Sequence, residues 1–145
     1  MNSSVHASWL PFLVSTLLTA VCCGCGSGIY PVEGKVVWKD GTPATELAGS
    51  QVVFELEEAN TSARGTVQPD ATFRLTTNTP DDGALPGEHK VLVIEAARPM
   101  LGGSDMITPG LLDPRYSDPS TSGLTETVKP GINQVTLTVE RNKKD

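Results

Sequence analysis

Residues 30–38 read YPVEGKVVW, and their side chains alternate between apolar and polar. Successive side chains of a β-strand point to opposite faces, so the alternation places one apolar set on a single face. That set comprises Val32, Gly34, Val36 and Trp38. Glu33 and Lys35 fall on the other face. The segment predicts a half-buried strand, and the Asp40-Gly41 pair after it predicts a tight turn.

Further apolar runs follow along the chain, separated by turn-forming residues. Strands are predicted at residues 51–57, 63–67, 72–77, 88–96, 124–128 and 135–139. The runs 63–67 and 72–77 surround a turn at Pro69-Asp70 and predict a hairpin. Residues 88–96 are apolar on both faces, which favours a central strand. No long amphipathic helical pattern occurs between Tyr30 and Arg141.

Seven short strands with regular turn signals predict an all-β fold, a seven-stranded antiparallel β-sandwich of transthyretin or immunoglobulin type. The length of 145 residues suits one such domain with a short appendage. Five aromatic residues follow the first 25 positions, spread one per element as core anchors would be. These are Tyr30, Trp38, Phe54, Phe73 and Tyr116. The net charge of -6 argues against a nucleic-acid partner.

The first 24 residues contain no Asp, Glu, Lys or Arg. Their apolar stretch at residues 10–21, LPFLVSTLLTAV, is about 18 Å long as a helix, too short for a bilayer but typical of a signal peptide. A buried helix of the domain is the alternative, which Pro11 and the abrupt change at Cys22 disfavour. The usual positive charge before the apolar stretch is missing, since only His6 and the terminal amine lie there.

All three cysteines, Cys22, Cys23 and Cys25, follow this stretch directly. The arrangement resembles a bacterial lipobox, which implies cleavage after Gly24 and lipidation of Cys25, with Cys22 or Cys23 as alternatives. Zinc binding is a further alternative, but structural zinc needs four ligands and the next histidine, His89, is far along the chain. The expected organisation is a signal peptide at 1–24, a lipidated cysteine and tether at 25–29, a sandwich at 30–141 and a polar tail at 142–145.

Four strings in order resemble the carboxypeptidase-regulatory-like bacterial lipoproteins. They are PVEGKVVWKDGTP (31–43), ATFRLTT (71–77), DDGALPGEHKVLV (81–93) and DPRYSDPSTSGLTETVKPGINQVTLTV (113–139). The resemblance implies a transthyretin-like sandwich with no attributed chemistry. Ala71 stands where the family usually has glycine after Asp70, which makes a left-handed turn there less favourable. His89 stands where the family usually has an aromatic residue.

Catalytic and metal-binding patterns are sparse. His89 is the single histidine after the leader, and no GxSxG string is present. We expect His89 to be a half-buried strand residue whose ring replaces an aromatic and whose nitrogens find a backbone or solvent partner. Five loop acids offer a calcium site as an alternative to turn formation, without the DxDxDG spacing that such a site favours. They are Asp81, Asp82, Asp105, Asp113 and Asp118.

The irregular stretch 97–123 is the longest in the chain and the place where a binding loop is most expected. Its apolar residues form either a lid on the sandwich, which we favour, or a patch that meets a partner. They are Met100, Leu101, Met106, Ile107, Leu111 and Leu112. In its second half, Tyr116 is expected to plug the core, with Asp118 and Ser122 binding loop backbone.

These features together predict a non-catalytic, lipid-anchored cell-envelope protein, periplasmic or surface-facing, that acts as a binding or scaffolding module. Its expected partners are membrane lipid, through Cys25, and an envelope protein or polysaccharide, with no cofactor and no metal. A carbohydrate-binding module is one alternative and requires Trp38 or Tyr116 to be solvent-exposed. A small hydrolase is another and requires His89 to lie in an open pocket beside a loop acid.

Overall fold

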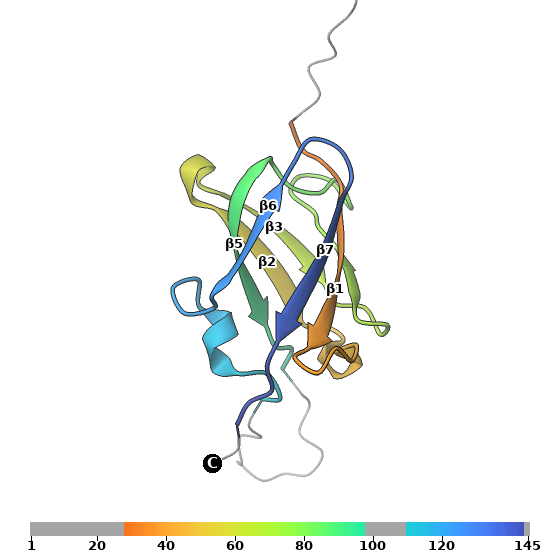
Figure 1. Cartoon of the computed structure of the whole chain (residues 1–145). Coiled ribbons are helices and arrows are strands. Elements are labelled where there is room, and N and C mark those ends of the chain that lie inside the picture. Colours follow the sequence, from red (N-terminus) through yellow and green to blue (C-terminus); the bar gives the residue numbers. More distant parts are fainter. Residues whose placement is uncertain (1–27, 98–109, 144–145) are drawn as a thin grey trace, which may run out of the picture.

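The computed structural model describes residues 28–97 and 110–143, and two β-sheets pack face to face in it (Figure 1). The strands are β1 (Val32–Trp38), β2 (Gln51–Leu56), β3 (Thr61–Thr66), β4 (Thr72–Arg74), β5 (Gly87–Ile94), β6 (Leu124–Val128) and β7 (Asn133–Val139). One sheet has the order β4-β1-β7 and the other the order β3-β2-β5-β6. The predicted seven-stranded all-β sandwich is confirmed.

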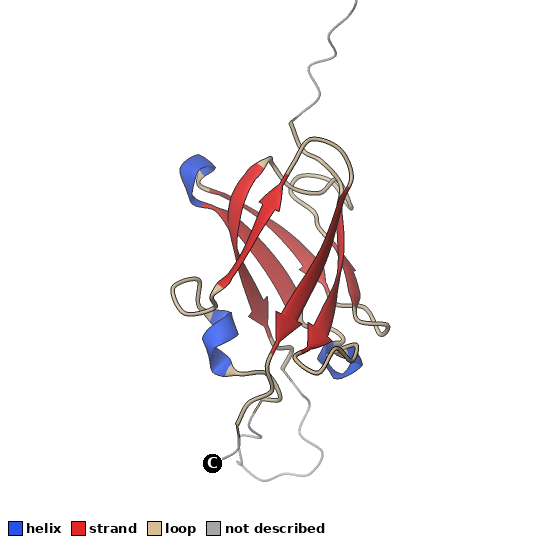
Figure 2. Cartoon of the chain, in the orientation of Figure 1, coloured by secondary structure: helices blue, strands red, loops and turns tan. Residues whose placement is uncertain are grey.

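Three short 3-10 helices lie at the ends of the sandwich (Figure 2). They are η1 (Thr45–Leu47), η2 (Glu57–Ala59) and η3 (Pro114–Ser117). The sequence pattern did not predict them, because three or four residues are too few to show a helical period. Residues 1–27, with Cys25, lie outside the described residues.

The alternating residues of β1 pack as predicted. Val32, Val36 and Trp38 are buried, whereas Lys35 is exposed. In the other sheet β2 and β5 are the two inner strands, which confirms the central position predicted for residues 88–96. Val53 and Leu92 are buried on the outer face of that sheet, 3% and 4% exposed, where they pair with each other.

One strand pair departs from the predicted antiparallel arrangement. Four of the five pairs are antiparallel, but β1 and β7 are parallel and in register from Val32↔Asn133 to Trp38↔Val139. A parallel pair needs a long crossover connection, and here the five intervening strands supply it. Alternation of side chains predicts which face is buried and carries no information on the direction of the neighbouring strand.

The predicted hairpin of residues 63–67 and 72–77 does not form. β3 pairs with β2, and β4 pairs with β1 in the other sheet. A single bridge between Arg64 and Thr76 joins the two segments. A Cβ at Gly65 would lie 2.3 Å from the carbonyl oxygen of Arg74, so the absence of a side chain allows the chain to cross closely from one sheet to the other.

The turn between β3 and β4 contains a residue in the left-handed conformation, although that residue is not glycine. Ala71 has a φ of 66°, so the expectation that alanine disfavours this turn was wrong. Local hydrogen bonds offset the strain, since the Ala71 N–H donates to the carbonyl of Gln68 at 2.9 Å. The Asp70 carboxylate also accepts from the Thr72 N–H at 3.0 Å and from its hydroxyl at 2.6 Å.

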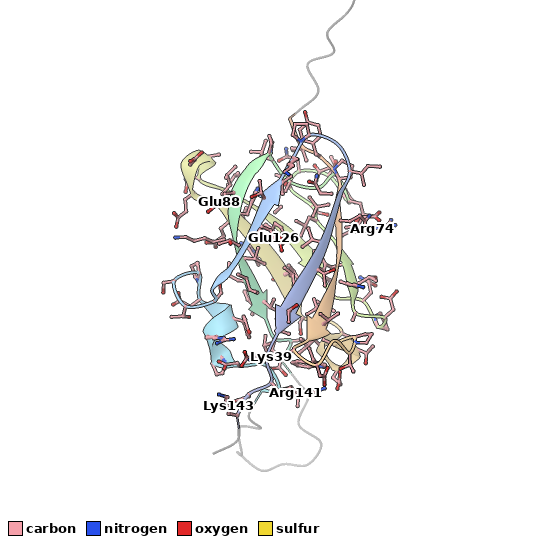
Figure 3. The ribbon with its side chains drawn as sticks, viewed as in Figure 1. Lys39, Arg74, Glu88, Glu126, Arg141 and Lys143 are labelled. Atoms are coloured by element: carbon pink, nitrogen blue, oxygen red, sulfur yellow. The ribbon has the colours of Figure 1, made fainter. Side chains whose placement is uncertain are left out.

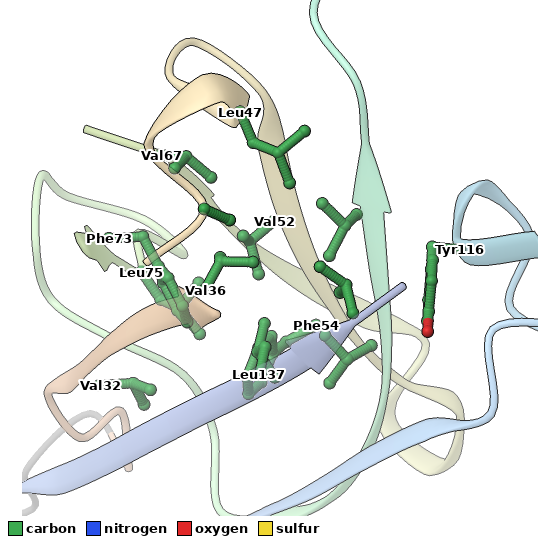
Figure 4. Packing of buried hydrophobic residues seen from close by; sticks show 14 of the residues in the cluster. Val32, Val36, Leu47, Val52, Phe54, Val67, Phe73, Leu75, Tyr116 and Leu137 are labelled. Carbon is green, nitrogen blue, oxygen red and sulfur yellow. The ribbon is translucent and has the colours of Figure 1, made fainter. Parts of the chain in front are cut away.

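The core lies between the sheets as one hydrophobic cluster (Figure 4). Its members include four of the five expected aromatic anchors, Trp38, Phe54, Phe73 and Tyr116, together with Val91 and Val93, and the fifth, Tyr30, packs against it. The rings of Phe54 and Phe73 are tilted against each other with centroids 6.4 Å apart. Tyr116 is 2% exposed and closes the core near the end of β5, as predicted.

Candidate functional site

An open groove of about 600 Å³ lies at the corner where the chain passes from β3 to β4. Polar side chains dominate its walls. The lining residues are Gln51, Arg64, Gly65, Thr66, Gln68, Thr72, Phe73, Arg74, Thr76 and Asp81. A second hollow of about 440 Å³ on the outer face of β4-β1-β7 shares Thr72 and Arg74 with it. The two hollows therefore form a continuous polar surface around Arg74.

The strand alternation explains why polar groups gather there. Arg64 and Thr66 are the exposed residues of β3, and they alternate with the buried Ala63 and Gly65. On β4, Thr72 and Arg74 are exposed while Phe73 points into the core. Since β3 and β4 are each at the edge of a sheet, the polar rows of both strands face the same corner.

The two arginines of the groove differ in their ionic partners. Arg74 forms an ion pair with Glu33 at 3.1 Å and lies 4.0 Å from Asp81. Arg64 forms no ion pair with any carboxylate of residues 28–97 and 110–143. A guanidinium without a carboxylate partner keeps its donors available for a ligand carboxylate or phosphate.

His89 lies inside the sandwich, 1% exposed. Its Nε2 lies 2.8 Å from the carbonyl oxygen of Leu85, and because a carbonyl only accepts, this nitrogen carries the proton. The ring packs at 5.7 Å from that of Phe54, as expected for a residue in an aromatic position. Nδ1 has no hydrogen-bond partner within the described chain, so His89 is more deeply buried than the expected half-buried residue and only one of its nitrogens has the expected partner. The open pocket that the hydrolase alternative requires is therefore not found at His89.

Glu126 lies opposite His89 in the β5–β6 register. Residues Leu124, Glu126 and Val128 share the inner face of β6, an edge strand. Burial raises the pKa of the Glu126 carboxyl. An inward charge on an edge strand disfavours pairing with the edge of another molecule, which explains a carboxylate in this position.

Neither aromatic residue that a carbohydrate platform would need is exposed. Trp38 and Tyr116 are each 2% exposed. The Trp38 indole donates to Glu46 at 3.1 Å, and the Arg141 guanidinium stacks 4.0 Å above its ring. The Tyr116 hydroxyl accepts from the Arg115 guanidinium at 2.6 Å and from the Glu140 N–H at 3.1 Å. Both rings therefore pack within the protein and are not available to stack on a sugar.

Most of the loop acids serve as hydrogen-bond acceptors in turns. Asp82 accepts from the N–H groups of Thr77, Asn78 and Thr79. Asp113 accepts from Arg115 N–H and Asp118 from Ser120 N–H, and both acceptors precede a proline. Ser122 binds the Leu124 N–H, so Asp118 and Ser122 both hold loop backbone as predicted.

Asp81 is exposed near Arg74, and Asp105 lies outside the described residues. Within residues 28–97 and 110–143, no three His, Cys, Asp or Glu side chains gather as metal ligands would.

Two of the six apolar residues proposed as a lid or partner patch are described. Leu112 is 4% exposed and belongs to the core, and Leu111 packs against it. The Glu95 carboxylate accepts from the N–H groups of both leucines at 3.0 Å. For Leu111 and Leu112 the structure therefore favours the lid. Met100, Leu101, Met106 and Ile107 lie outside the described residues, as does Cys25.

Comparison with family models, curated protein sequences and solved structures found no match to this chain. In the part of the chain that the structure describes, no helix is long and apolar enough to span a membrane.

Sequence reasoning did not predict the groove. The sequence does show alternating polar residues, Arg64 and Thr66 on β3 and Thr72 and Arg74 on β4. Because these two strands were predicted to pair as a hairpin, the corner that their polar residues share was not recognised.

Proposed function

We propose that this chain is a non-catalytic, lipid-anchored protein of the cell envelope whose sandwich binds an acidic polysaccharide in the β3–β4 groove. The lipobox pattern around Cys25 and the resemblance to carboxypeptidase-regulatory-like lipoproteins support the anchor. The unpaired guanidinium of Arg64 in an open polar groove carries the binding half of the proposal.

The chemistry of the groove suits a ligand rich in hydroxyl and carboxylate groups. Arg64 supplies charge-assisted donors, and the side chains of Gln51 and Gln68 add amide donors and acceptors. The adjoining hollow extends the polar surface beyond Arg74, giving room for a chain of several sugar units. No aromatic stacking is needed, which agrees with the buried positions of Trp38 and Tyr116.

Substitution of Arg64 tests the proposed binding of a polysaccharide in the β3–β4 groove. We expect Arg64→Ala to weaken co-sedimentation with an isolated, carboxylate-bearing envelope polysaccharide by about 10- to 150-fold, because a charge-assisted hydrogen bond contributes roughly 1.5 to 3 kcal/mol. Arg64→Lys should retain part of the binding, since it keeps the charge and loses the planar fork. Lys129→Ala is the matched control, removing an exposed cation away from the groove. Equal binding of Arg64→Ala and the parent would contradict the assigned site.

Substitution of the cysteines tests the anchor. Cys25→Ala should abolish metabolic labelling by a radioactive fatty acid in a bacterium that processes lipoproteins, whereas Cys22→Ala and Cys23→Ala should retain it. Labelling that persists in Cys25→Ala and disappears in one of the other two variants would move the modified residue upstream.

A further inference from the structure

The end of the sandwich from which the N-terminal segment leaves is built from three short stretches, residues 28–31, 84–87 and 128–133. A bridge joins Tyr30 to Ala84. Gly87 pairs with Val128, and the Asn133 N–H donates to the carbonyl of Pro31 at 3.0 Å. These contacts place all three stretches at the upper end in Figure 1, and we call them the N-terminal rim.

The N-terminal rim is almost free of charge. Lys129 is the only charged residue in the three stretches. Half-buried or exposed apolar residues make up much of the rest: Ile29, Tyr30, Pro31, Leu85, Pro86, Pro130 and Ile132. Ile132, at the β6–β7 turn, is 79% exposed. Within the described chain the other exposed large hydrophobic side chain is Ile94, at 42%.

The opposite end is highly charged, as the labelled Lys39, Arg141 and Lys143 indicate (Figure 3). Its charged residues include Lys39, Asp40, Glu46, Glu95, Asp113, Arg115, Glu140, Arg141 and Lys143. Many of them pair with one another, for example Lys39 with Glu140 at 2.8 Å and Arg141 with Glu46 at 3.2 Å. The two ends of one small domain thus differ sharply in polarity, although the chain carries a net charge of -6.

Several acids near the N-terminal rim have cationic or N–H partners, and two, Glu58 and Glu88, have none within the described residues. Glu57 on η2 forms an ion pair with Lys90, and Asp81 lies near Arg74. Asp82 is occupied by three backbone N–H groups. Glu58 is exposed on η2, which lies to the side of this end in Figure 1, and Glu88 is exposed on β5 directly after Gly87 of the rim. The three stretches of the rim themselves carry no carboxylate, so the rim can approach an uncharged surface.

The length of the tether determines how far the rim can be from a lipid on Cys25. Two residues, Gly26 and Ser27, separate Cys25 from Gly28, and the three steps from Cys25 to Gly28 span at most about 11 Å in an extended chain. A domain anchored through Cys25 must consequently keep one end close to the bilayer, and that end is the rim. Exposed apolar side chains gain by leaving water for the headgroup region, whereas the charged opposite end would lose its hydration there.

We propose that the N-terminal rim rests on the bilayer, with Ile132 entering the headgroup region, so that the sandwich stands upright with its charged end directed away from the membrane. This orientation rests on the proposed lipid anchor at Cys25. It makes the rim a second membrane contact and gives the sandwich a defined orientation instead of free rotation on the tether.

Site-directed fluorescence tests the orientation. Ile132→Cys and the matched control Lys143→Cys, at the charged end, are each prepared in the full chain, lipid-modified in a bacterium and labelled with a thiol-reactive fluorophore. Acylated Cys25 does not react with the fluorophore. The proteins are placed in phosphatidylcholine vesicles with or without lipids that carry a nitroxide on the acyl chain. Because Ile132 is exposed, Ile132→Cys should retain the thermal unfolding temperature of the parent.

The expected result is that the nitroxide lipids quench most of the fluorescence at position 132 and leave position 143 unchanged. Absence of quenching at 132, or equal quenching at both positions, in protein that floats with the vesicles would overturn the orientation and leave the anchor intact. Protein with an intact Cys25 that fails to float with the vesicles would overturn the anchor and the orientation together.

Discussion

The ring of Phe73 on β4 packs directly against the backbone of Gly34 on β1. The two residues are paired in the β1–β4 register, and a Cβ at Gly34 would lie 2.4 Å from Phe73 Cζ. It would also lie 2.9 Å from the carbonyl oxygen of Val135 on β7. A residue without a side chain in the middle strand of this sheet therefore lets the aromatic ring of the edge strand enter the core.

Gly34→Ala should lower the free energy of unfolding by about 1 to 3 kcal/mol, since the new methyl group must displace the Phe73 ring. Urea unfolding measures the change. In a Phe73→Leu background, whose shorter side chain leaves room, the cost of Gly34→Ala should fall, giving a non-additive double-mutant cycle. Additive costs would mean that the two residues do not compete for the same space.

Phe73→Ala should cost about 3 to 5 kcal/mol, because it removes a fully buried ring and leaves a cavity. This is a large share of the roughly 5 to 15 kcal/mol by which a domain is stable. Denaturant unfolding of the variant checks the value. A cost below about 1 kcal/mol would place the ring at the surface and contradict the assignment of β4.

Gly65→Ala should destabilise the protein and disturb the groove, because its methyl group would meet the backbone of Arg74 at 2.3 Å and a backbone atom cannot turn aside. We expect a loss of about 1 to 3 kcal/mol in thermal or denaturant unfolding, together with weaker polysaccharide binding. Arg64→Ala is the informative comparison, since it should weaken binding while leaving unfolding unchanged. Unchanged stability in Gly65→Ala would argue against the close crossing of β3 and β4.

Glu126→Gln should stabilise the protein at neutral pH. Burial raises the pKa of Glu126 above its ordinary 4.5, so the folded state binds the proton more tightly than the unfolded state. Its contribution to stability is therefore greatest below pH 4.5 and is lost as the pH rises through the raised value. The gain from Glu126→Gln in urea unfolding should be larger at pH 7 than at pH 4. Glu88→Gln, at an exposed position on β5, is the control and should show no such difference.

Side-chain alternation accounts for the success of the strand predictions. Residues 30–38, 51–57 and 124–128 coincide closely with β1, β2 and β6 because each buries one face, and burial leaves a period of two in the sequence. The turn at Asp40-Gly41 was also predicted correctly, and Gly41 adopts the positive φ that such a turn favours.

The arrangement of the strands could not be obtained in the same way. The parallel pairing of β1 with β7 and the separation of β3 from β4 depend on contacts between residues far apart in the sequence. Gly65 was the local sign of the crossing, but a glycine in a strand is also compatible with a bulge. The left-handed conformation of Ala71 was not predicted, because alanine does not favour it. Hydrogen bonds to the Gln68 carbonyl and the Asp70 carboxylate stabilise the turn in which Ala71 adopts this conformation.

The groove was missed for the same reason. Its arginines, Arg64 and Arg74, read in the sequence as ordinary outward residues of a hairpin, and only the division of β3 and β4 between two sheets brings their polar rows to a common corner. Trp38 and Tyr116 were expected to be buried, and the structure confirms both. His89 was expected to be half-buried and is more deeply buried than that, at 1% exposed.

The mass of the N-terminal peptide tests the lipid anchor most directly. The full chain is expressed in a bacterium that processes lipoproteins, extracted from the membrane fraction and analysed by mass spectrometry after proteolysis. We predict a mature chain that begins at Cys25 and carries a diacylglyceryl group on its sulfur. A chain that still begins at Met1, or one that begins at Cys25 with a free thiol, would contradict the lipid anchor.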